Sequence, residues 1–187
     1  VIDATKGYTY YGIEDEAVIG EDDGWYTFDP TGVIEERYAG DDEFPIGTGF
    51  LATFVTSHNP TLTSAGEVLT GDVVIDTKVG EAYVAHMFVA NPFPCNTKLG
   101  EIKATGMRYQ VDYIQFIDPV TAVIDKTKTY TYYGIEDEAV VGEDDGWYTF
   151  DPTGIIEERY ANNDVLNAGD GFICTFVPSH EIKLTFK

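Results

Sequence analysis

Basic residues are scarce in this chain. It has 33 Asp and Glu residues against 11 Lys and Arg residues, which gives a formal net charge of −22 at neutral pH. A surface of this sign repels phosphate backbones and anionic bilayers. We therefore expect neither nucleic acid nor a membrane surface among its partners.

Long apolar runs and cysteines are also few. No apolar stretch reaches the roughly 20 residues that a membrane-spanning helix needs, so we expect no membrane insertion. The two cysteines, Cys95 and Cys174, allow at most one disulfide, which a secreted protein could form. They make a structural zinc site unfavourable, because the three histidines show no metal-ligand spacing. The chain starts with Val1 rather than Met, as a processed and exported protein would.

Aromatic and turn-forming residues are abundant. The 13 Tyr and 11 Phe residues, together with 19 Gly and 8 Pro, favour strands and tight turns over helices. The composition therefore predicts an all-β fold.

An internal repeat dominates the sequence. Residues 1–65 (the first block) recur without a gap at 123–187 (the second block), on either side of a unique middle segment, 66–122. Only four of the first 39 aligned positions differ: Ala4/Lys126, Gly7/Thr129, Ile19/Val141 and Val33/Ile155. Such similarity indicates recent duplication and predicts the same fold for both blocks.

The repeat also suggests how the chain is divided. We expect a β-sandwich or two packed antiparallel β-units, with boundaries at 1–75 and 76–187. The first unit would be N-terminally incomplete, because partner strands from a preceding middle segment would be missing. The middle segment should therefore pair more extensively with the second block.

Local patterns place several elements. The turn Asp29-Pro30-Thr31-Gly32 suits a type I turn, so residues 25–38 are predicted to form a hairpin. Other predicted strands cover 7–11, 49–55, 61–65, 67–76, 82–90 and 113–118. Asn96 resembles a helix N-cap, which predicts a short helix over Thr97–Ala104.

Acidic residues cluster in each block. The cluster nearest the tryptophan comprises Glu21, Asp22 and Asp23 in the first block and Glu143, Asp144 and Asp145 in the second. These carboxylates could hold calcium, which prefers oxygen ligands, and the sequence suggests no other cofactor. However, the EF-hand spacing is missing, and a solvated loop that discourages edge pairing is the alternative interpretation.

A Trp-Tyr pair follows each acidic cluster. Trp25 with Tyr26, and Trp147 with Tyr148, could form platforms on which a sugar ring stacks. The alternative is that these aromatic residues point inward and pack in the core, as most strand tryptophans do.

Hydrolytic chemistry has little support in the sequence. Ser57-His58 and Ser179-His180 place a nucleophile beside a base, but neighbouring strand residues point to opposite faces. The carboxylates that glycoside hydrolysis would need are bunched in polar loops rather than in an apolar cleft. We therefore expect no enzymatic activity.

A succession of short motifs resembles a known kind of module. It runs through Asn91-Pro92-Phe93-Pro94, Leu99-Gly100-Glu101-Ile102, Tyr113-Ile114-Gln115, Gly146-Trp147 and Gly169-Asp170-Gly171-Phe172. It resembles the tandem β-repeat modules of large secreted or surface-attached bacterial proteins, over roughly residues 83–187. The resemblance implies an all-β, exported, tandem module and brings no catalytic residues with it.

Together these features predict a non-enzymatic, exported bacterial β-module that serves as a structural or adhesive segment of a larger surface or secreted protein. The alternative is a carbohydrate-binding module that uses Trp25 and Trp147 with the neighbouring carboxylates. A glycan or a surface protein would be the partner.

Overall fold

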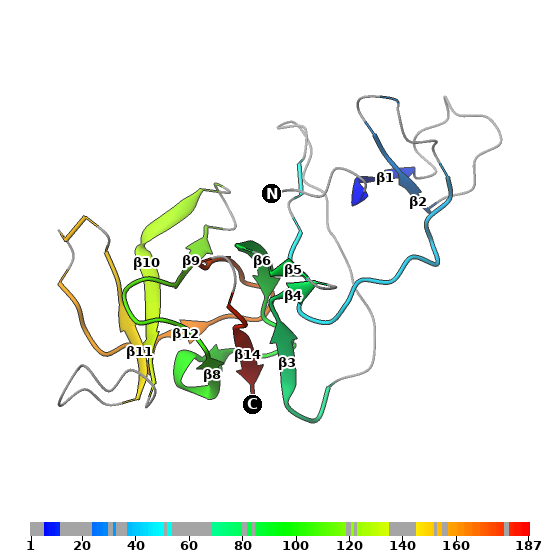
Figure 1. Ribbon diagram of the computed structural model, residues 1–187. Coiled ribbons are helices and arrows are strands. Elements are labelled where there is room, and N and C mark those ends of the chain that lie inside the picture. The colour runs from blue at the N-terminus through cyan, green and yellow to red at the C-terminus, as the bar shows by residue number, and fades with distance from the viewer. Residues whose placement is uncertain are drawn as a thin grey trace. The chain divides into compact units, whose positions relative to one another are not determined.

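The structure is a computed structural model of the 187-residue chain. It describes residues 6–11, 24–29, 32, 37–50, 52–53, 69–79, 82–83, 85–118, 121, 123–134, 145–151, 153–154, 157–177 and 180–187. The chain divides into two compact units, Val1–Pro45 and Ile46–Lys187, both visible in Figure 1. The described elements are strands apart from one short 3₁₀ helix, which confirms the all-β prediction.

The first unit is built on a two-stranded antiparallel sheet. Strand β1 (Tyr8–Tyr11) pairs with β2 (Gly24–Thr27), with Tyr10 opposite Trp25. The end residues of the predicted turn are joined, because the backbone N–H of Gly32 donates to the carbonyl oxygen of Asp29 at 3.0 Å, while Pro30 and Thr31 lie outside the described residues. A bridge between Tyr26 and Tyr38 then brings the returning chain alongside β2, although residues 33–36 of the predicted hairpin lie outside the described residues.

The second unit contains a five-stranded antiparallel sheet with the order β11-β10-β9-β13-β6. Its strands are β6 (His86–Ala90), β9 (Tyr113–Ile117), β10 (Ile124–Tyr133), β11 (Gly146–Thr149) and β13 (Gly171–Thr175). Strand β9 comes from the middle segment and lies between β10 and β13 of the second block.

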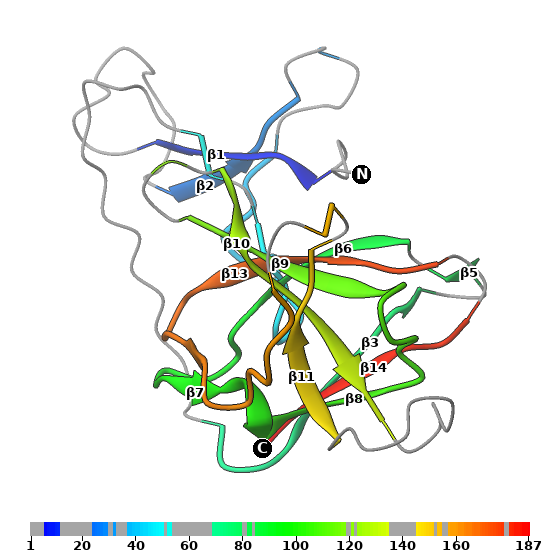
Figure 2. The ribbon, with the colours of Figure 1, turned by 90° about the vertical axis from the view of Figure 1, so that its left-hand side faces the viewer.

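A three-stranded antiparallel sheet, β3-β14-β8, accompanies it. Its strands are β3 (Val73–Asp76), β8 (Ile102–Thr105) and β14 (Lys183–Phe186). Buried and more exposed residues alternate along all three strands, so one face of this sheet points inward. Phe172 of β13 stacks on Phe186 of β14 with ring centroids 6.5 Å apart, which joins the two sheets. Figure 2 shows β3, β14 and β8 of the three-stranded sheet side by side.

Two small sheets complete the described elements. Strand β7 (Thr97–Lys98) pairs with β12 (Val165–Leu166), and β4 (Lys78–Val79) pairs with β5 (Ala82–Tyr83). The middle segment thus supplies partners for β10, β12, β13 and β14 of the second block. This agrees with the prediction that it pairs extensively with that block.

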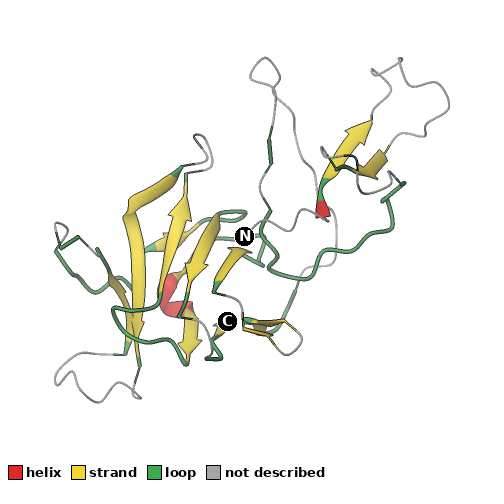
Figure 3. Ribbon diagram, turned by 45° about the horizontal axis from the view of Figure 1, so that its top comes forward, coloured by secondary structure: helices red, strands yellow, loops and turns green. Residues whose placement is uncertain are grey.

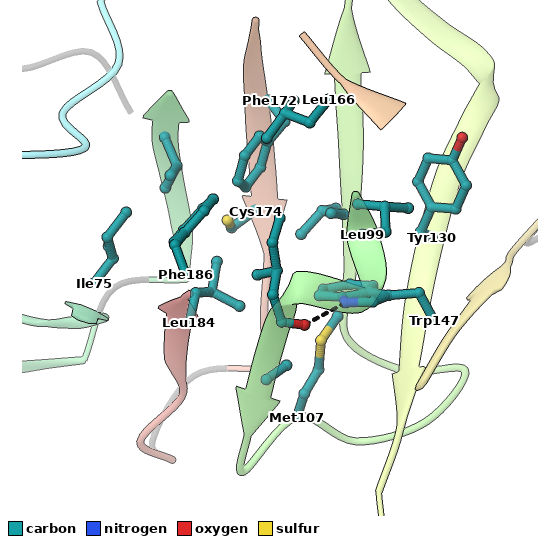
Figure 4. Packing of buried hydrophobic residues seen from close by; sticks show 14 of the residues in the cluster. Ile75, Leu99, Met107, Tyr130, Trp147, Leu166, Phe172, Cys174, Leu184 and Phe186 are labelled. Carbon is teal, nitrogen blue, oxygen red and sulfur yellow. Dashed lines mark hydrogen bonds between the residues drawn. The ribbon is translucent and has the colours of Figure 1, made fainter. Parts of the chain in front are cut away.

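One hydrophobic core fills the second unit. Its largest fully buried side chains include Trp147, Phe172, Phe186, Leu99 and Ile102. Figure 4 shows the packing, with residues of the middle segment and of the second block in the same cluster. The core therefore depends on both parts of the chain.

The predicted helix over Thr97–Ala104 is wrong. This segment forms β7, a single 3₁₀ turn called η2 (Leu99–Glu101), and the start of β8, as the colours of Figure 3 indicate. Thr97 pairs with Leu166, and Ile102 pairs with Phe186. Pairing with these distant strands outweighs the weak local preference for a helix.

The boundary between the two units differs from the boundary that the repeat predicts. Among the described residues, the predicted strand 49–55 of the first block forms no regular strand, but Thr48 bridges to Val89 of β6. Phe172 of the second block pairs with the same Val89 from the other side. Because residues 46–50 are tied to β6 in this way, they belong to the second unit, whereas the sequence had placed the boundary after residue 75.

Candidate functional site

The same hairpin is built twice. In the second unit, β10 and β11 pair Tyr132 with Trp147, and in the first unit β1 and β2 pair Tyr10 with Trp25. Each pair of rings makes an edge contact, with centroids 5.2 Å apart in the second unit and 5.3 Å in the first. The register of the two hairpins is therefore identical at a spacing of 122 residues.

An Arg-Asp-Tyr clasp follows each hairpin. In the second unit, Arg159 donates to both carboxylate oxygens of Asp164 at 2.9 and 2.6 Å, and the Tyr130 hydroxyl donates to Asp164 at 2.8 Å. In the first unit, Arg37, Asp42 and Tyr8 make the same contacts at 2.8, 2.7 and 3.1 Å. Each clasp ties the chain that follows the hairpin to its first strand.

In each clasp, the positive charge of the arginine pairs with the negative charge of the aspartate. The hydrogen bond from Arg159 holds the pKa of Asp164 below its ordinary value, and Arg37 does the same for Asp42. Burial, and then the hydrogen bond to Asp164, raise the pKa of Tyr130 well above its ordinary value. These shifts favour a neutral phenol beside an ionised carboxylate, so the clasp suits a structural role better than proton transfer.

A glycine opens the second strand of each hairpin. Gly146 has φ +148°, and Gly24 has φ +154°, a region that side chains with a Cβ rarely adopt. A Cβ atom on Gly146 would lie within 2.6 Å of both side-chain polar atoms of Asn162. The first residue of the repeated Gly-Trp dipeptide is therefore a glycine because of its backbone conformation and, at Gly146, because of the close packing of Asn162.

The two proposed sugar platforms differ in exposure. Trp147 is completely buried and its indole Nε1 donates to the carbonyl oxygen of Ile102 at 2.7 Å, as the dashed line in Figure 4 marks. Trp25 is 40% exposed. Tyr26 and Tyr148 are both buried. Of these four proposed ligand-binding residues, Trp25 is the one that presents its ring to solvent.

The proposed calcium loops are mostly outside the described part of the chain. Glu21, Asp22, Asp23, Glu143 and Asp144 lie there, and Asp145 is described and exposed. Within the described residues, no group of three or more His, Cys, Asp or Glu side chains is placed to hold a metal ion. The calcium hypothesis for these loops stays a prediction.

His180 lies beside the buried carboxylate of Asp112, a residue that is not among the candidates predicted from the sequence. Its Nε2 is 3.0 Å from Oδ2 of Asp112, whose side chain is completely buried. Because a carboxylate only accepts, Nε2 carries the proton, and among the described groups no partner reaches the buried Nδ1. Ser57, His58 and Ser179 lie outside the described residues. Of the Ser-His pairs, the structure therefore describes only His180, with Asp112 as its partner, and no serine nucleophile beside it.

Asp112 also connects backbone segments. Its carboxylate accepts hydrogen bonds from the backbone N–H groups of Arg108 at 2.8 Å and Val177 at 2.6 Å. These bonds join the loop before β9 and the segment after β13 to one buried side chain. A lone Asp before an apolar strand gave no signal of this role, whereas Asp42 and Asp164 could have been found as a pair that recurs in both blocks.

The remaining predictions concern cysteines and membranes. Cys95 is exposed and Cys174 is buried, and both are free thiols, so the disulfide that a secreted protein could form is not present. In the described part of the chain, no helix is long and apolar enough to cross a membrane.

Comparisons with known proteins add no assignment. The chain matches no protein-family model, no curated protein and no solved structure.

Proposed function

We propose that the chain is a non-enzymatic, exported β-module of a bacterial protein, and that it serves as a structural or adhesive segment of a larger surface or secreted protein. The observation that carries this proposal is the recurrence of hairpin and clasp in the same register 122 residues apart. A repeated scaffold with internally satisfied charges suits a tandem structural element.

Duplication has a direct use in such a protein. Modules of one array that expose the same surface can engage one target together, which raises avidity without any new contact. The acidic surface keeps a long array of modules soluble and opposes association between like-charged copies.

Surface labelling tests this proposal. Antibodies against the chain should label intact cells of the organism that produces it, and deletion of the gene should reduce attachment of those cells to their substratum. Labelling that appears only after permeabilisation would contradict an exported module. Turnover of a polysaccharide, ester or peptide substrate by the purified chain would contradict a non-enzymatic role.

Carbohydrate binding is the second candidate, and the exposure of Trp25 favours it. An exposed indole can stack on a sugar ring while neighbouring carboxylates accept hydrogen bonds from hydroxyls. On a glycan array, binding should be lost in Trp25→Ala and retained in Tyr38→Ala, which changes another exposed aromatic residue of the same unit. Removal of calcium with a chelator would show whether the acidic loops take part.

A further inference from the structure

The middle segment covers the hairpin of the second unit. The carbonyl oxygen of Ile102 accepts the indole N–H of Trp147, and the ring of Phe116 lies 5.4 Å from that of Tyr130. Strand β9 pairs along β10, with Ile114 opposite Tyr130. Both the aromatic face and the outer edge of this hairpin are therefore occupied by residues of the middle segment.

Backbone bonds complete this cover. The N–H of Leu99 donates to the carbonyl oxygen of Asp164 at 2.9 Å, and the N–H of Gly100 donates to that of Asn162 at 3.0 Å. Thr131 of β10 donates through Oγ1 to the carbonyl oxygen of Asp112 at 2.9 Å. The turn η2 and the loop before β9 are thus fixed to the hairpin and to the chain that follows it.

Every group that the second block uses in these contacts is also present in the first block. The counterparts of Tyr130, Thr131, Trp147 and Asp164 are Tyr8, Thr9, Trp25 and Asp42, all identical. Asn162 corresponds to Gly40, but the contact to Gly100 uses a backbone carbonyl, which any residue provides. The first block therefore retains all of these groups, and it differs at Gly7, the counterpart of Thr129, whose Oγ1 accepts a hydrogen bond from Gln115.

In the first unit this surface faces solvent. Trp25 is 40% exposed and Tyr10 is 54% exposed, whereas Trp147 is fully buried and Tyr132 packs against the core. Phe44 is 57% exposed, and its counterpart Leu166 is fully buried. Tyr8 in β1 corresponds to Tyr130, which lies opposite Ile114 of β9. We call the exposed residues Tyr10 and Trp25 the open hairpin surface.

We propose that the open hairpin surface is a receptor for a segment of the same kind as residues 66–122, supplied by a neighbouring module of the same repeat. The segment would cover Trp25 with a turn like η2, as the middle segment does for Trp147. Backbone hydrogen bonds from this turn and burial of the aromatic rings would supply the affinity. The receptor role rests on the proposed place of the chain in a tandem array.

A chain extended at its N-terminus tests this receptor role. An additional copy of residues 66–122 is joined directly ahead of Val1, because Ala122 directly precedes Val123, the counterpart of Val1. Both the original and the extended chain are labelled with 5-fluorotryptophan, and the Trp25 resonance is assigned in each with Trp25→Phe. The middle segment contains no tryptophan, so the spectrum holds two signals, from Trp25 and Trp147.

In the original chain, Trp25 should show a fluorine solvent-isotope shift between H₂O and D₂O, and Trp147 should show none. In the extended chain, Trp25 should lose this shift and its resonance should move toward that of Trp147. A matched control carries Ile114→Asp in the added copy alone, which spoils the inward face of its β9 strand without changing its length. In this control, Trp25 should stay solvent-exposed.

Two results would overturn the proposal. The first is an extended chain in which Trp25 keeps its isotope shift while the Trp147 signal shows an intact second unit. The second is burial of Trp25 that grows with the concentration of the original chain, which would assign the surface to a second copy of the chain. Neither result affects surface labelling of intact cells, so failure here is distinct from failure of the proposed function.

Discussion

The indole nitrogen of Trp147 donates a 2.7 Å hydrogen bond to the carbonyl oxygen of Ile102, two residues that lie 45 positions apart in the chain. The bond joins the repeated hairpin to the unique middle segment inside the hydrophobic core. Its counterpart Trp25 has the same neighbours in sequence but is 40% exposed. The chain thus contains a matched pair of tryptophans in two environments.

Substitution of these two tryptophans should have very different effects on stability. Trp147→Phe removes buried volume and leaves the carbonyl oxygen of Ile102 without its donor, so we expect a loss of about 2 kcal/mol in the free energy of unfolding. Trp25→Phe should change that free energy by less than about 0.5 kcal/mol. Urea denaturation followed by far-UV circular dichroism measures both, and equal effects would contradict the assignment of Trp147 alone to the core.

Asp112 should be the most sensitive acidic residue of the second unit. Asp112→Asn would replace an acceptor with an NH₂ group that faces backbone N–H groups or His180, at an expected cost of about 3 kcal/mol. Asp72→Asn is the control, because Asp72 is exposed, and it should cost less than about 0.5 kcal/mol. Thermal and urea unfolding of the two variants would show the difference, and a stable Asp112→Asn protein would rule out the proposed anchoring role.

Acid should weaken the second unit through its clasp. Asp164 has a folded-state pKa below its ordinary value of 3.8, so the unfolded chain takes up this proton first. The contribution to stability is present above about pH 4 and is lost as the pH falls toward the folded-state pKa. Asp164→Asn should therefore be less stable at neutral pH and should lose less stability on acidification than the original chain.

The equivalent change in the first unit is the matched control. Arg37 and Asp42 form the same pair with nearly the same exposure, but their partner Tyr8 is half-buried, whereas Tyr130 is buried, so solvent screens the first clasp more. Asp42→Asn should therefore change the acid dependence less than Asp164→Asn. A larger effect of Asp42→Asn, measured by urea unfolding across this pH range, would contradict the ranking of the two clasps.

The two thiols should react at very different rates. Cys95 is exposed, whereas Cys174 is fully buried, and burial raises the pKa of its thiol. Iodoacetamide should therefore modify Cys95 in the native chain and Cys174 only after denaturation, because the thiolate is the reactive form. Mass spectrometry of tryptic peptides gives both extents, and modification of Cys174 under native conditions would contradict its place in the core.

Several elements could be predicted because their signals are local. The Asp29–Gly32 turn follows from the positions of its Pro and Gly residues, and β9 follows from alternating apolar residues over Tyr113–Ile117. The segment Thr97–Ala104 could not be assigned locally. Leu99 and Ile102 are three residues apart, as on a helix face, and only pairing with β12 and β14 far along the chain selects strands.

The candidate site also has residues that the sequence predicted and residues that it did not. The sequence singled out Trp25 and Trp147 as equivalent residues, and the hairpins around them are equivalent in register and ring contacts. It missed Asp112, because a carboxylate becomes an anchor only when Arg108, Val177 and His180 gather around it. Convergence of residues up to 68 positions apart leaves no local pattern.

By itself the sequence determined the β-rich composition, the acidic charge and the exact spacing at which the hairpin recurs. It also determined that both hairpins carry the same Tyr, Trp, Arg and Asp residues, so local chemistry builds the same strand pair and clasp twice. Only the tertiary structure decided that Trp147 is buried and Trp25 is exposed. The reason is physical: burial depends on whether another segment covers the hairpin, and the middle segment covers the hairpin of the second unit.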